Sequence, residues 1–426
     1  MNLSTPLRAS IITVSVLSSG YMHAAAPTTS DILQNYADIA HATYADSLIT
    51  AKALNSVIDQ FLAQPTAANL TKARNAWVAA RAPYQQSEAY RFGNALVDAW
   101  EGKVNAWPLD EGLIDYVADS YGADSDENPF YTANIIANKK LTIGGIAVDA
   151  TKIDKNLLAE TLHEIDEVEA NVATGYHAIE FLLWGQDLNG TAPGAGNRPA
   201  TDYDLHNCTG GNCDRRRDYL KATAELLIDD LQDMTTSWAA KGAARQDLLA
   251  KGPEAGLATI LTGMGSLAYG ELAGERTKLG LMLHDPEEEH DCFSDNTHYS
   301  HFYDALGIKN VYLGEYTRVD GSTISGPSLS DLVKTEAPVV DQHLRNRLDN
   351  TQQAAQAMVD AAHKGNTFDV LIGENNLEGN QLVQSFVDSL VAEAEAIEHT
   401  IAVLKLDNIE LEGSESLDNP SAVLAE

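Results

Sequence analysis

The sequence has few aromatic residues, few basic residues and few cysteines. Aromatic residues occupy 7% of the 426 positions, and 28 basic residues stand against 62 acidic ones, which gives a formal charge of −34 at pH 7. Such a charge repels nucleic acids and anionic membrane surfaces, so we expect no nucleic-acid partner. Most of the carboxylates are expected to solvate the surface, although their field would concentrate cations near a site in a cleft.

Long apolar runs are also missing. After the first 26 residues, no segment reaches the roughly 18 uninterrupted apolar residues that span a bilayer, so we expect no membrane insertion. Residues 1–26 are typical of an export signal, because Arg8 precedes the apolar stretch Ile11–Leu17 and His23–Ala26 ends in small residues. No cysteine follows this leader to accept a lipid. These features predict a periplasmic or cell-surface protein, with an uncleaved N-terminus as the alternative.

The three cysteines are too few for a zinc ribbon, which needs two Cys pairs. Cys208 and Cys213 bracket the residues Thr-Gly-Gly-Asn, and Cys292 stands alone. In an oxidising compartment this spacing predicts a small loop closed by a Cys208–Cys213 disulfide. Cys292 is then expected to be a free thiol.

Alternating patterns typical of strands are absent apart from a short piece over 141–148, and helical periodicity dominates. It predicts an all-α fold of two helical bundles. The expected helices cover residues 31–62, 67–98, 155–168, 176–184, 215–240, 256–280, 330–364 and 380–404. A stretch rich in Gly, Pro, Asn and Cys at 189–213 is the expected boundary. We therefore expect a signal peptide at 1–26, an N-terminal helical bundle at 27–205, a C-terminal helical bundle at 206–406 and an acidic, disordered tail at 407–426.

The segment Gly175–Gly185 places one His and one Glu inside an otherwise apolar run. Residues three apart share a face of a helix, so His177 and Glu180 should point the same way. Because this helix is apolar on every side, it should be buried. Burial without partners would cost several kcal/mol, so the two side chains must bond each other, bond other polar groups or hold a cation.

Other charged residues stand where a site could use them. The expected helix over 67–98 has a stripe with four-three spacing, formed by Trp77, Arg81, Tyr84, Glu88 and Arg91. An internal salt-bridge ladder is the usual explanation of such a stripe. The alternative is that Glu88 lies near a site, with the arginines neutralising carboxylates or binding an anion.

Two further segments supply candidates. Asp110 and Asp115 flank a short stretch in which carboxylates could simply cap a helix start. The segment 284–301 holds four histidines among six acidic residues, a composition that also suits a solvated loop. Within it, Asp295 and His298 are three apart, and we take them as the contribution of the C-terminal half to a site.

The pattern Gly-x-His-x-x-Glu at Gly175–Glu180, followed by Phe-Leu-Leu-Trp-Gly-Gln-Asp, resembles the signature of the imelysin family, which includes the iron-regulated protein A group of secreted bacterial proteins. Matching blocks lie within Arg81–Phe92, Asn105–Tyr116 and Asp291–His298, so the resemblance covers most of the chain after residue 26. It implies two similar helical domains with a cleft between them. It also implies a connection with iron, which composition alone cannot name.

The resemblance and the buried pair together favour a metal-binding protein that captures iron for uptake. A histidine nitrogen with a carboxylate oxygen suits transition-metal ions better than calcium, and zinc or another divalent ion is the alternative to iron. We expect His177 and Glu180 to be the ligands. Further groups of the cleft are expected to be Glu88, Arg91, Asp115, Asp295 and His298. The expected ligand is a metal ion or a small metal–anion complex, passed to a membrane transport partner.

Two other classes of function stay open. Imelysin itself is classed as a metallopeptidase, but zincin and inverzincin helices carry two His ligands and one Glu, and position 181 is Phe. Distant residues would have to complete a catalytic site. A structural scaffold or adhesin would have no reason to bury His177 and Glu180 together.

Overall fold

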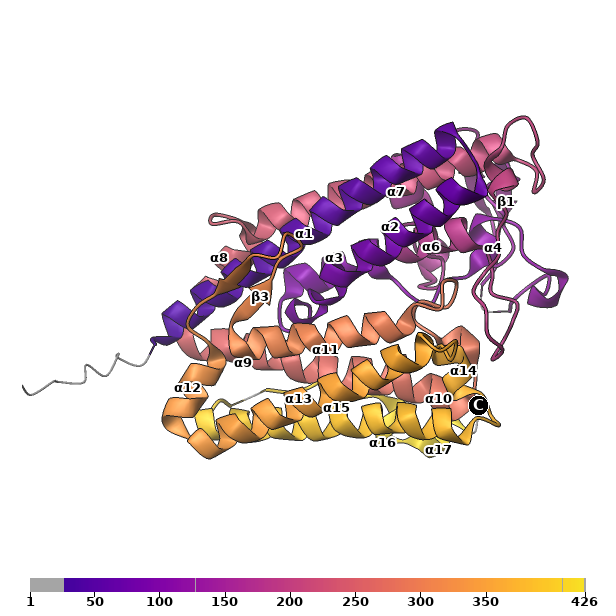
Figure 1. Ribbon diagram of the computed structural model, residues 1–426. Helices are drawn as coiled ribbons and strands as arrows, with labels where there is room; N and C mark the ends of the chain where they lie inside the picture. Colours follow the sequence, from indigo (N-terminus) through magenta and orange to yellow (C-terminus); the bar gives the residue numbers. More distant parts are fainter. Residues whose placement is uncertain (1–26, 127, 408, 425–426) are drawn as a thin grey trace, which may run out of the picture.

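The computed structural model describes residues 27–126, 128–407 and 409–424. The expected signal peptide at 1–26 lies outside these residues. Figure 1 shows two layers of long helices, with the two short hairpins at their margins. The expected all-α fold is confirmed in this part of the chain, and the expected strand-like piece is the hairpin of β1 (Lys140–Ile143) and β2 (Ile146–Asp149).

The first layer begins with α1 (Thr29–Ala63) and α2 (Ala67–Gln85), which pack together as antiparallel neighbours. A capping box starts α1: the Thr28 hydroxyl accepts from the Asp31 amide at 3.2 Å, and the Asp31 carboxylate accepts from the Thr28 amide at 3.2 Å. These contacts satisfy amide groups that a helix start leaves unpaired.

The second helix is shorter than expected. The single helix over 67–98 is wrong, because α2 ends at Gln85 and is followed by the 3₁₀ turn η1 (Glu88–Tyr90) and by α3 (Ala95–Asn105). Pro83 has no amide hydrogen to donate within the last turn of α2. Gly93 then takes a φ of 77°, which reverses the chain before α3. Glu88 and Arg91 therefore leave the stripe that Trp77 and Arg81 begin.

Helix α7 (Cys213–Trp238) also lies in the first layer, where it packs along α1 and contacts α6 (Gly175–Trp184) and α3. The expected C-terminal bundle starts at residue 206, yet α7 packs with the N-terminal helices. The chain changes layer later, between α8 (Ala243–Ala250) and α9 (Pro253–Ser266). The expected division at 205/206 thus does not coincide with the change of layer.

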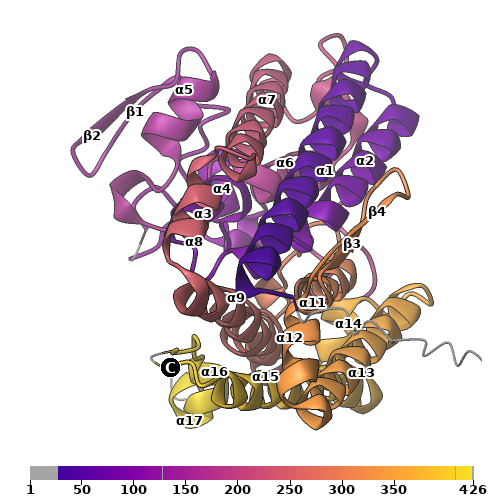
Figure 2. The same cartoon turned by 90° about the vertical axis from the view of Figure 1, so that its left-hand side faces the viewer.

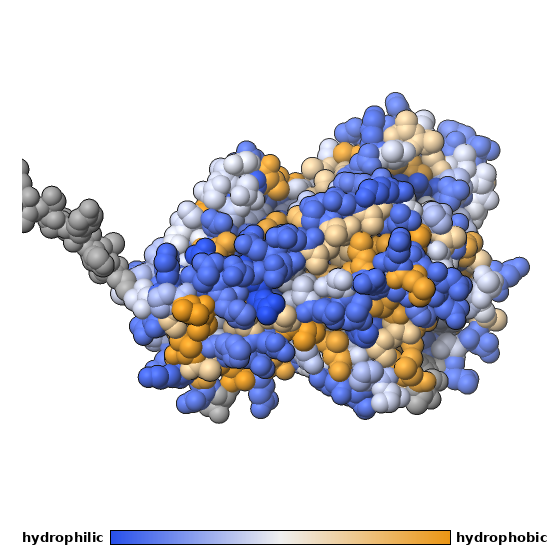
Figure 3. All heavy atoms as spheres, turned by 60° about the horizontal axis from the view of Figure 1, so that its bottom comes forward, coloured by the Kyte–Doolittle hydropathy of each residue, from blue (hydrophilic) through white to orange (hydrophobic). Residues whose placement is uncertain are grey.

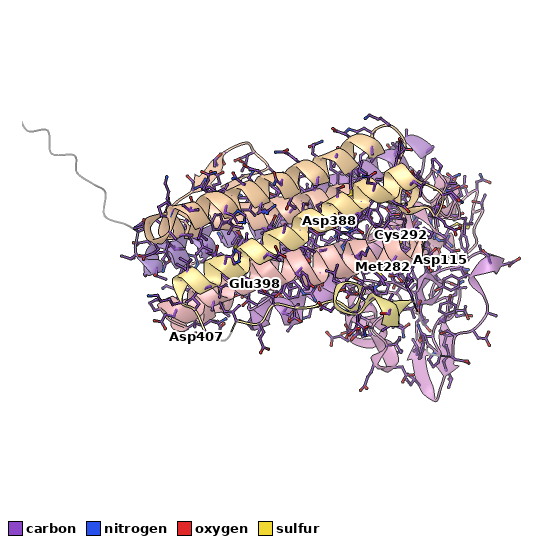
Figure 4. All side chains as sticks on the ribbon, turned by 90° about the horizontal axis from the view of Figure 1, so that it is seen from below. Asp115, Met282, Cys292, Asp388, Glu398 and Asp407 are labelled. Carbon is purple, nitrogen blue, oxygen red and sulfur yellow. A yellow bond between two sulfur atoms is a disulfide. The ribbon has the colours of Figure 1, made fainter. Side chains whose placement is uncertain are left out.

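The second layer is built on α11 (Thr297–Leu313), α13 (Pro338–Ala362) and α15 (Leu377–Leu404), and Figure 4 shows the last two running side by side. The expected helix over 256–280 is observed as α9, the π-helical η6 (Leu267–Lys278) and α10 (Leu279–Leu283). The layers meet where α11 packs on α2 and α9 packs on α1.

Short elements complete the fold. The expected helix over 330–364 divides into α12 (Leu329–Glu336) and α13 at Pro338, which cannot donate to a preceding turn. The hairpin of β3 (Glu315–Thr317) and β4 (Thr323–Ser325), which we did not expect, contacts α1. The connections contain α4 (Glu111–Ile114), η2 (Asp119–Tyr121), α5 (Lys155–Leu157), η3 (Leu158–Leu162), η4 (Ile165–Glu167), η5 (Ala200–Tyr203), η7 (Pro286–Glu288) and α14 (Phe368–Ile372).

We expected residues 407–426 to be disordered. Residues 409–424 instead form helical turns and bond to the second layer. These helical turns are α16 (Glu415–Asp418) and α17 (Pro420–Val423), which lie beside α15 in Figure 2. The Ser416 hydroxyl donates to the Gly274 carbonyl at 3.1 Å. A side chain at Gly270 would collide with the backbone of Glu412, so the absence of one lets the tail lie against η6.

Hydrophilic side chains cover most of the face drawn in Figure 3, with apolar groups between them. None of the described helices is long and apolar enough to cross a bilayer.

Candidate metal centre

Helix α6 is buried along its whole length, as its apolar pattern predicts. Its first residue, Gly175, has a φ of 79°, and a Cβ there would collide with the backbone of Val104 in α3. Glycine therefore allows α6 to begin directly against α3. His177 is 1% exposed and Glu180 is 0% exposed.

His177 and Glu180 bond each other, as their spacing indicates. The Nδ1 of His177 lies 3.0 Å from the Oε2 of Glu180. The Oε1 of Glu180 accepts from the amide of Ser294 at 3.0 Å and from its hydroxyl at 2.7 Å. The carboxylate therefore fixes the orientation of the imidazole and joins α6 to the segment before α11.

The other nitrogen of His177 is directed elsewhere. Among the residues that the structure describes, its Nε2 has no hydrogen-bond partner. Burial, reinforced by the nearby Arg81 guanidinium, lowers the pKa of His177 to about 3. The ring is thus neutral at physiological pH, which is the state that binds a metal ion.

His290 faces His177. The two ring centroids lie 4.8 Å apart in an edge-to-face arrangement, and His290 is 1% exposed. Neither of its ring nitrogens has a hydrogen-bond partner in the described part of the chain. Burial, with Arg276 and His177 adding to it, holds the pKa of His290 well below its usual range. Two neutral imidazoles thus meet in one buried place.

Asp291 adds a carboxylate to the two histidines. One ligand atom from each of His177, His290 and Asp291 lies within 4.8 Å of the others. The Oδ1 of Asp291 is 2.8 Å from the Nη2 of Arg81, and its Oδ2 accepts from Asn296 at 2.9 Å and from the Ser300 hydroxyl. Burial opposes ionisation of Asp291, but Arg81 outweighs it and lowers the pKa of this carboxyl. Asp291 is therefore ionised.

Arg81 is held in place from several sides. Its Nη1 donates to the Oδ1 of Asn105 at 2.6 Å, and its guanidinium lies 5.1 Å from the ring centroid of Tyr176. Arg81, which we considered as part of an internal salt-bridge ladder, thus holds the carboxylate of Asp291 in place.

A cavity of about 540 Å³ reaches His290 from between the two layers. Arg276 on its wall pairs with Glu88 at 2.8 Å, Glu271 at 2.6 Å and Asp304 at 3.3 Å. The wall is formed by Arg91, Asp98, Ala99, Glu101, Gly102, Asn105, Ala106, Trp107, Pro108, Glu164, Glu169, Glu271, Glu275, Arg276 and His290. Six of these residues are acidic and two are basic, so the cavity favours cations.

The candidate residues from the sequence lie in several places. Glu88 is buried against Arg276, and Arg91 lines the cavity, bonded to Asp98 at 2.9 Å. His298 is 7% exposed and lies beside Tyr299, outside the group of His177, His290 and Asp291.

Asp115 and Asp295 belong to other clusters. The carboxylate of Asp115 pairs with Arg198 at 2.6 Å and with Arg216 at 2.6 Å. Asp295 lies with Asp187 and Asp369. Neither residue takes part in the group around His177.

His290 and Asp291 are the members of the group that we did not select from the sequence. They stand in the segment 284–301 that we did single out, and Asp291 opens one of the blocks that resemble the family. That block was the available signal, but we chose Asp295 and His298 in it because they share a helical spacing. No periodicity pairs a loop residue such as His290 with a helix from the other layer.

The structure joins Cys208 and Cys213 in a disulfide. Cys292 is the free cysteine among the described residues, and burial raises the pKa of its thiol well above the usual range. Figure 4 labels Cys292 and Asp115 at the same end of the molecule, opposite Asp407.

Comparison with known families agrees with these features. The sequence model of the imelysin family, also named peptidase M75, matches residues 40–397. The chain belongs to the imelysin family. Iron-regulated protein A of Synechococcus elongatus is 24% identical to this imelysin-family chain over 342 residues, which are 78% of this chain and 76% of the relative.

Two crystal structures share the fold of this imelysin-family protein. A protein from Parabacteroides distasonis, described as an iron-regulated protein A precursor, superposes on this chain with a TM-score of 0.62 at 20% identity. The superposition covers 89% of this chain and 97% of the other. An imelysin-like protein from Psychrobacter arcticum gives a TM-score of 0.59 at 15% identity, covering 90% of this chain and 98% of its own. At these identities the likeness concerns the fold.

Proposed function

We propose that this imelysin-family protein is an exported metal-binding protein that captures iron for uptake, with His177, His290 and Asp291 as ligands. The observation that carries the proposal is the meeting of two buried, neutral imidazoles with an ionised carboxylate. Nitrogen and oxygen donors in this combination suit iron and other transition metals.

Burial of these histidines has a cost that a cation would offset. Three ring nitrogens, His177 Nε2 and both nitrogens of His290, lack a hydrogen-bond partner within the described residues. An unsatisfied buried polar group costs about 1–3 kcal/mol. A metal ion between the rings would use one nitrogen of each.

Glu180 has a different role in this proposal from the one we expected from the sequence. Its two oxygens bond His177 and Ser294, and Glu180 lies outside the group of His177, His290 and Asp291 whose ligand atoms lie within 4.8 Å of one another. We propose that Glu180 orients His177 instead of binding the metal. A cation on Nε2 favours the tautomer in which Nδ1 donates to an ionised Glu180, and this opposes the effect of burial, which raises the pKa of Glu180.

The charges on the cavity wall favour a metal ion as the ligand and disfavour a metal–anion complex. Its two arginines, Arg91 and Arg276, already face carboxylates. With six acidic groups on its wall, it would attract a hydrated cation and repel a free anion. The name of the Synechococcus relative refers to regulation by iron, which supports iron as the metal. Delivery to a membrane transport partner is part of the proposal.

The test is a titration of the chelator-treated protein with Fe(II) under anaerobic conditions. His177→Ala and His290→Ala should each weaken binding at least about tenfold, roughly 1.4 kcal/mol. His206→Ala removes an exposed histidine and is the matched control. Unchanged affinity in both folded variants would show that the two histidines have a structural role.

The family's name peptidase M75 makes a metallopeptidase the second candidate. Such an enzyme needs a base beside a metal-bound water. Glu180 is the nearest carboxylate on the helix, but its oxygens are engaged, so we propose no hydrolysis at this site. Cleavage of unfolded protein by zinc-loaded protein, abolished in folded Glu180→Gln, would favour the enzyme.

A further inference from the structure

A second cluster of ligand-type side chains lies apart from the histidines. Asp187 follows α6, Asp295 precedes α11, and Asp369 lies in α14. One carboxylate oxygen from each lies within 4.8 Å of the others. Three separate segments of the chain therefore direct carboxylates at one point.

Asp369 is the most buried of the three aspartates, and it has no hydrogen bond among the described residues that would compensate for its burial. Asp369 is 0% exposed, and within residues 27–126, 128–407 and 409–424 neither of its oxygens accepts a hydrogen bond. Burial raises the pKa of Asp369 in spite of the nearby Thr367 hydroxyl and Val370 amide, neither of which reaches hydrogen-bonding geometry with it. Thr367 Oγ1 is itself unbonded in this described part of the chain.

The other members leave oxygens available. Asp295 is 7% exposed, and its Oδ1 is unbonded among the described residues. Asp187 accepts from Asn189 through Oδ1 alone, at 2.9 Å from the amide and 2.6 Å from the side chain. In the part of the chain that the structure describes, no basic side chain forms an ion pair with Asp187, Asp295 or Asp369.

A fourth acidic side chain lies close enough to the cluster to interact with it. Glu289 is 1% exposed, and its Oε1 has no partner among the described side chains and amides. These carboxylates repel one another at close range, which a bound cation would reverse.

We propose that Asp187, Asp295 and Asp369 bind a divalent hard cation, and that Ca²⁺ is the ion that fits best. Every donor is an oxygen, whereas a transition metal would be favoured by nitrogen or sulfur. Ca²⁺ accepts carboxylates and hydroxyls in flexible arrangements, while Mg²⁺ demands near-octahedral geometry and retains water. The Thr367 hydroxyl and the Glu289 carboxylate lie close to Asp369 and would add ligands to the bound ion.

At this position, a bound ion would connect separate segments of the structure. Asp187 is close in sequence to the end of α6, which carries His177 and Glu180. Asp295 is one residue beyond Ser294, which bonds Glu180. A cation held by both, and by Asp369 in α14, would fasten the two segments that form the histidine group to the second layer.

The experiment measures Ca²⁺ binding by equilibrium dialysis and thermal unfolding after EGTA treatment. Ca²⁺ should raise the unfolding temperature of the wild type, since it binds the folded state. Asp369→Asn and Asp295→Asn should each weaken the tightest Ca²⁺ site at least tenfold. Without Ca²⁺, Asp369→Asn should unfold at a higher temperature than the wild type, because one buried repelling charge is removed.

The controls separate this site from diffuse binding and from the histidine centre. Asp233→Asn removes an exposed carboxylate of α7 and should leave the tightest site unchanged. His177→Ala should also leave it unchanged. Equal Ca²⁺ affinity in Asp369→Asn, Asp295→Asn and Asp233→Asn would overturn the proposal, and tighter binding of Mg²⁺ than of Ca²⁺ would overturn the choice of ion. If Asp369→Asn does not fold, the half-buried Asp187→Asn takes its place in the comparison.

Discussion

The Oε2 of Glu180 lies 3.0 Å from the Nδ1 of His177, and the same carboxylate accepts from Ser294 through its other oxygen. This arrangement occupies the Nδ1 of His177 and leaves its Nε2 without a hydrogen-bond partner among the described residues. A carboxylate that bonds a ligating histidine commonly sets its orientation and its tautomer. In the proposed metal centre, His177 is therefore the ligand and Glu180 its positioning residue.

We predict that Glu180→Gln weakens Fe(II) binding about tenfold, at the low end of the 10–100-fold range for such outer partners. The amide keeps the shape of the side chain, but with its oxygen accepting from Ser294, its NH₂ group cannot accept a hydrogen bond from the Nδ1 of His177. Calorimetric titration measures the affinity, with the exposed Glu160→Gln as the control. A loss beyond the roughly 10–100-fold range of such outer partners would instead make Glu180 a ligand, which is what we expected from the sequence.

Asp115 should be critical for stability and not for metal binding. Its carboxylate pairs with Arg198 and with Arg216, and all three side chains are buried. Asp115→Asn removes the only carboxylate that pairs with Arg216 among the described residues and leaves Arg198 with Asp202 at 3.5 Å. We expect a loss of about 3–5 kcal/mol in the free energy of unfolding. Urea denaturation measures it.

The matched control for Asp115 is Asp98→Asn, which breaks the pair of Asp98 with Arg91 at 2.9 Å. The Asp98 side chain is 52% exposed, so this change should cost no more than about 1 kcal/mol. Similar losses in both variants would contradict the assignment of Asp115 to the stability of the fold.

Local patterns predicted the helices better than they predicted the site. The apolar run around His177 gave the right helix and the right face, because both depend on residues close in sequence. Pro83 was expected to kink the helix over 67–98, but the helix ends altogether at Gln85. Helix α7 packs with the N-terminal helices although it follows the expected boundary, since a loop rich in Gly and Pro marks a turn but not which layer the next helix joins.

The site required contacts between distant segments. His290 reaches His177 only because the segment before α11 lies across α6, and no helical or strand period encodes that path. Asp295 and His298 share a helical spacing, yet Asp295 precedes α11 with a φ of 54° and turns to Asp187 and Asp369. Resemblance to a family marked the correct block, and the packing of the layers decided which of its residues meet His177.

We predict that the exported protein carries one modifiable thiol. Alkylation in denaturant without a reductant should label Cys292 alone, because Cys208 and Cys213 are joined. In the folded protein the labelling should be slow, since burial and the nearby Glu180 raise the pKa of the Cys292 thiol. Peptide mass spectrometry distinguishes the outcomes: three labelled cysteines, or a cross-link to Cys292, would refute the pairing.

Glu393 should make the protein less stable as the pH rises. It lies in α15, is 1% exposed, and among the described residues both of its oxygens lack a hydrogen-bond partner. Burial raises its pKa to about 7, and Thr351 and Lys309 oppose the shift only in part. The unfolded chain ionises this carboxyl near its ordinary pKa of about 4.3. Between these two values the unfolded state binds fewer protons, so stability falls as the pH rises through this window.

Glu393→Gln keeps the size of the side chain and removes the ionisation. It should therefore be more stable than the wild type at pH 8, by roughly 4 kcal/mol at most, and the advantage should vanish near pH 4.5. The difference between the two urea-denaturation curves across this range isolates Glu393 from every other titrating group. Glu395→Gln, an exposed change two residues along the same helix, reports the effect of losing a surface carboxylate. If the advantage of Glu393→Gln does not grow between pH 4.5 and pH 8, Glu393 is paired in solution by a group that offsets its burial.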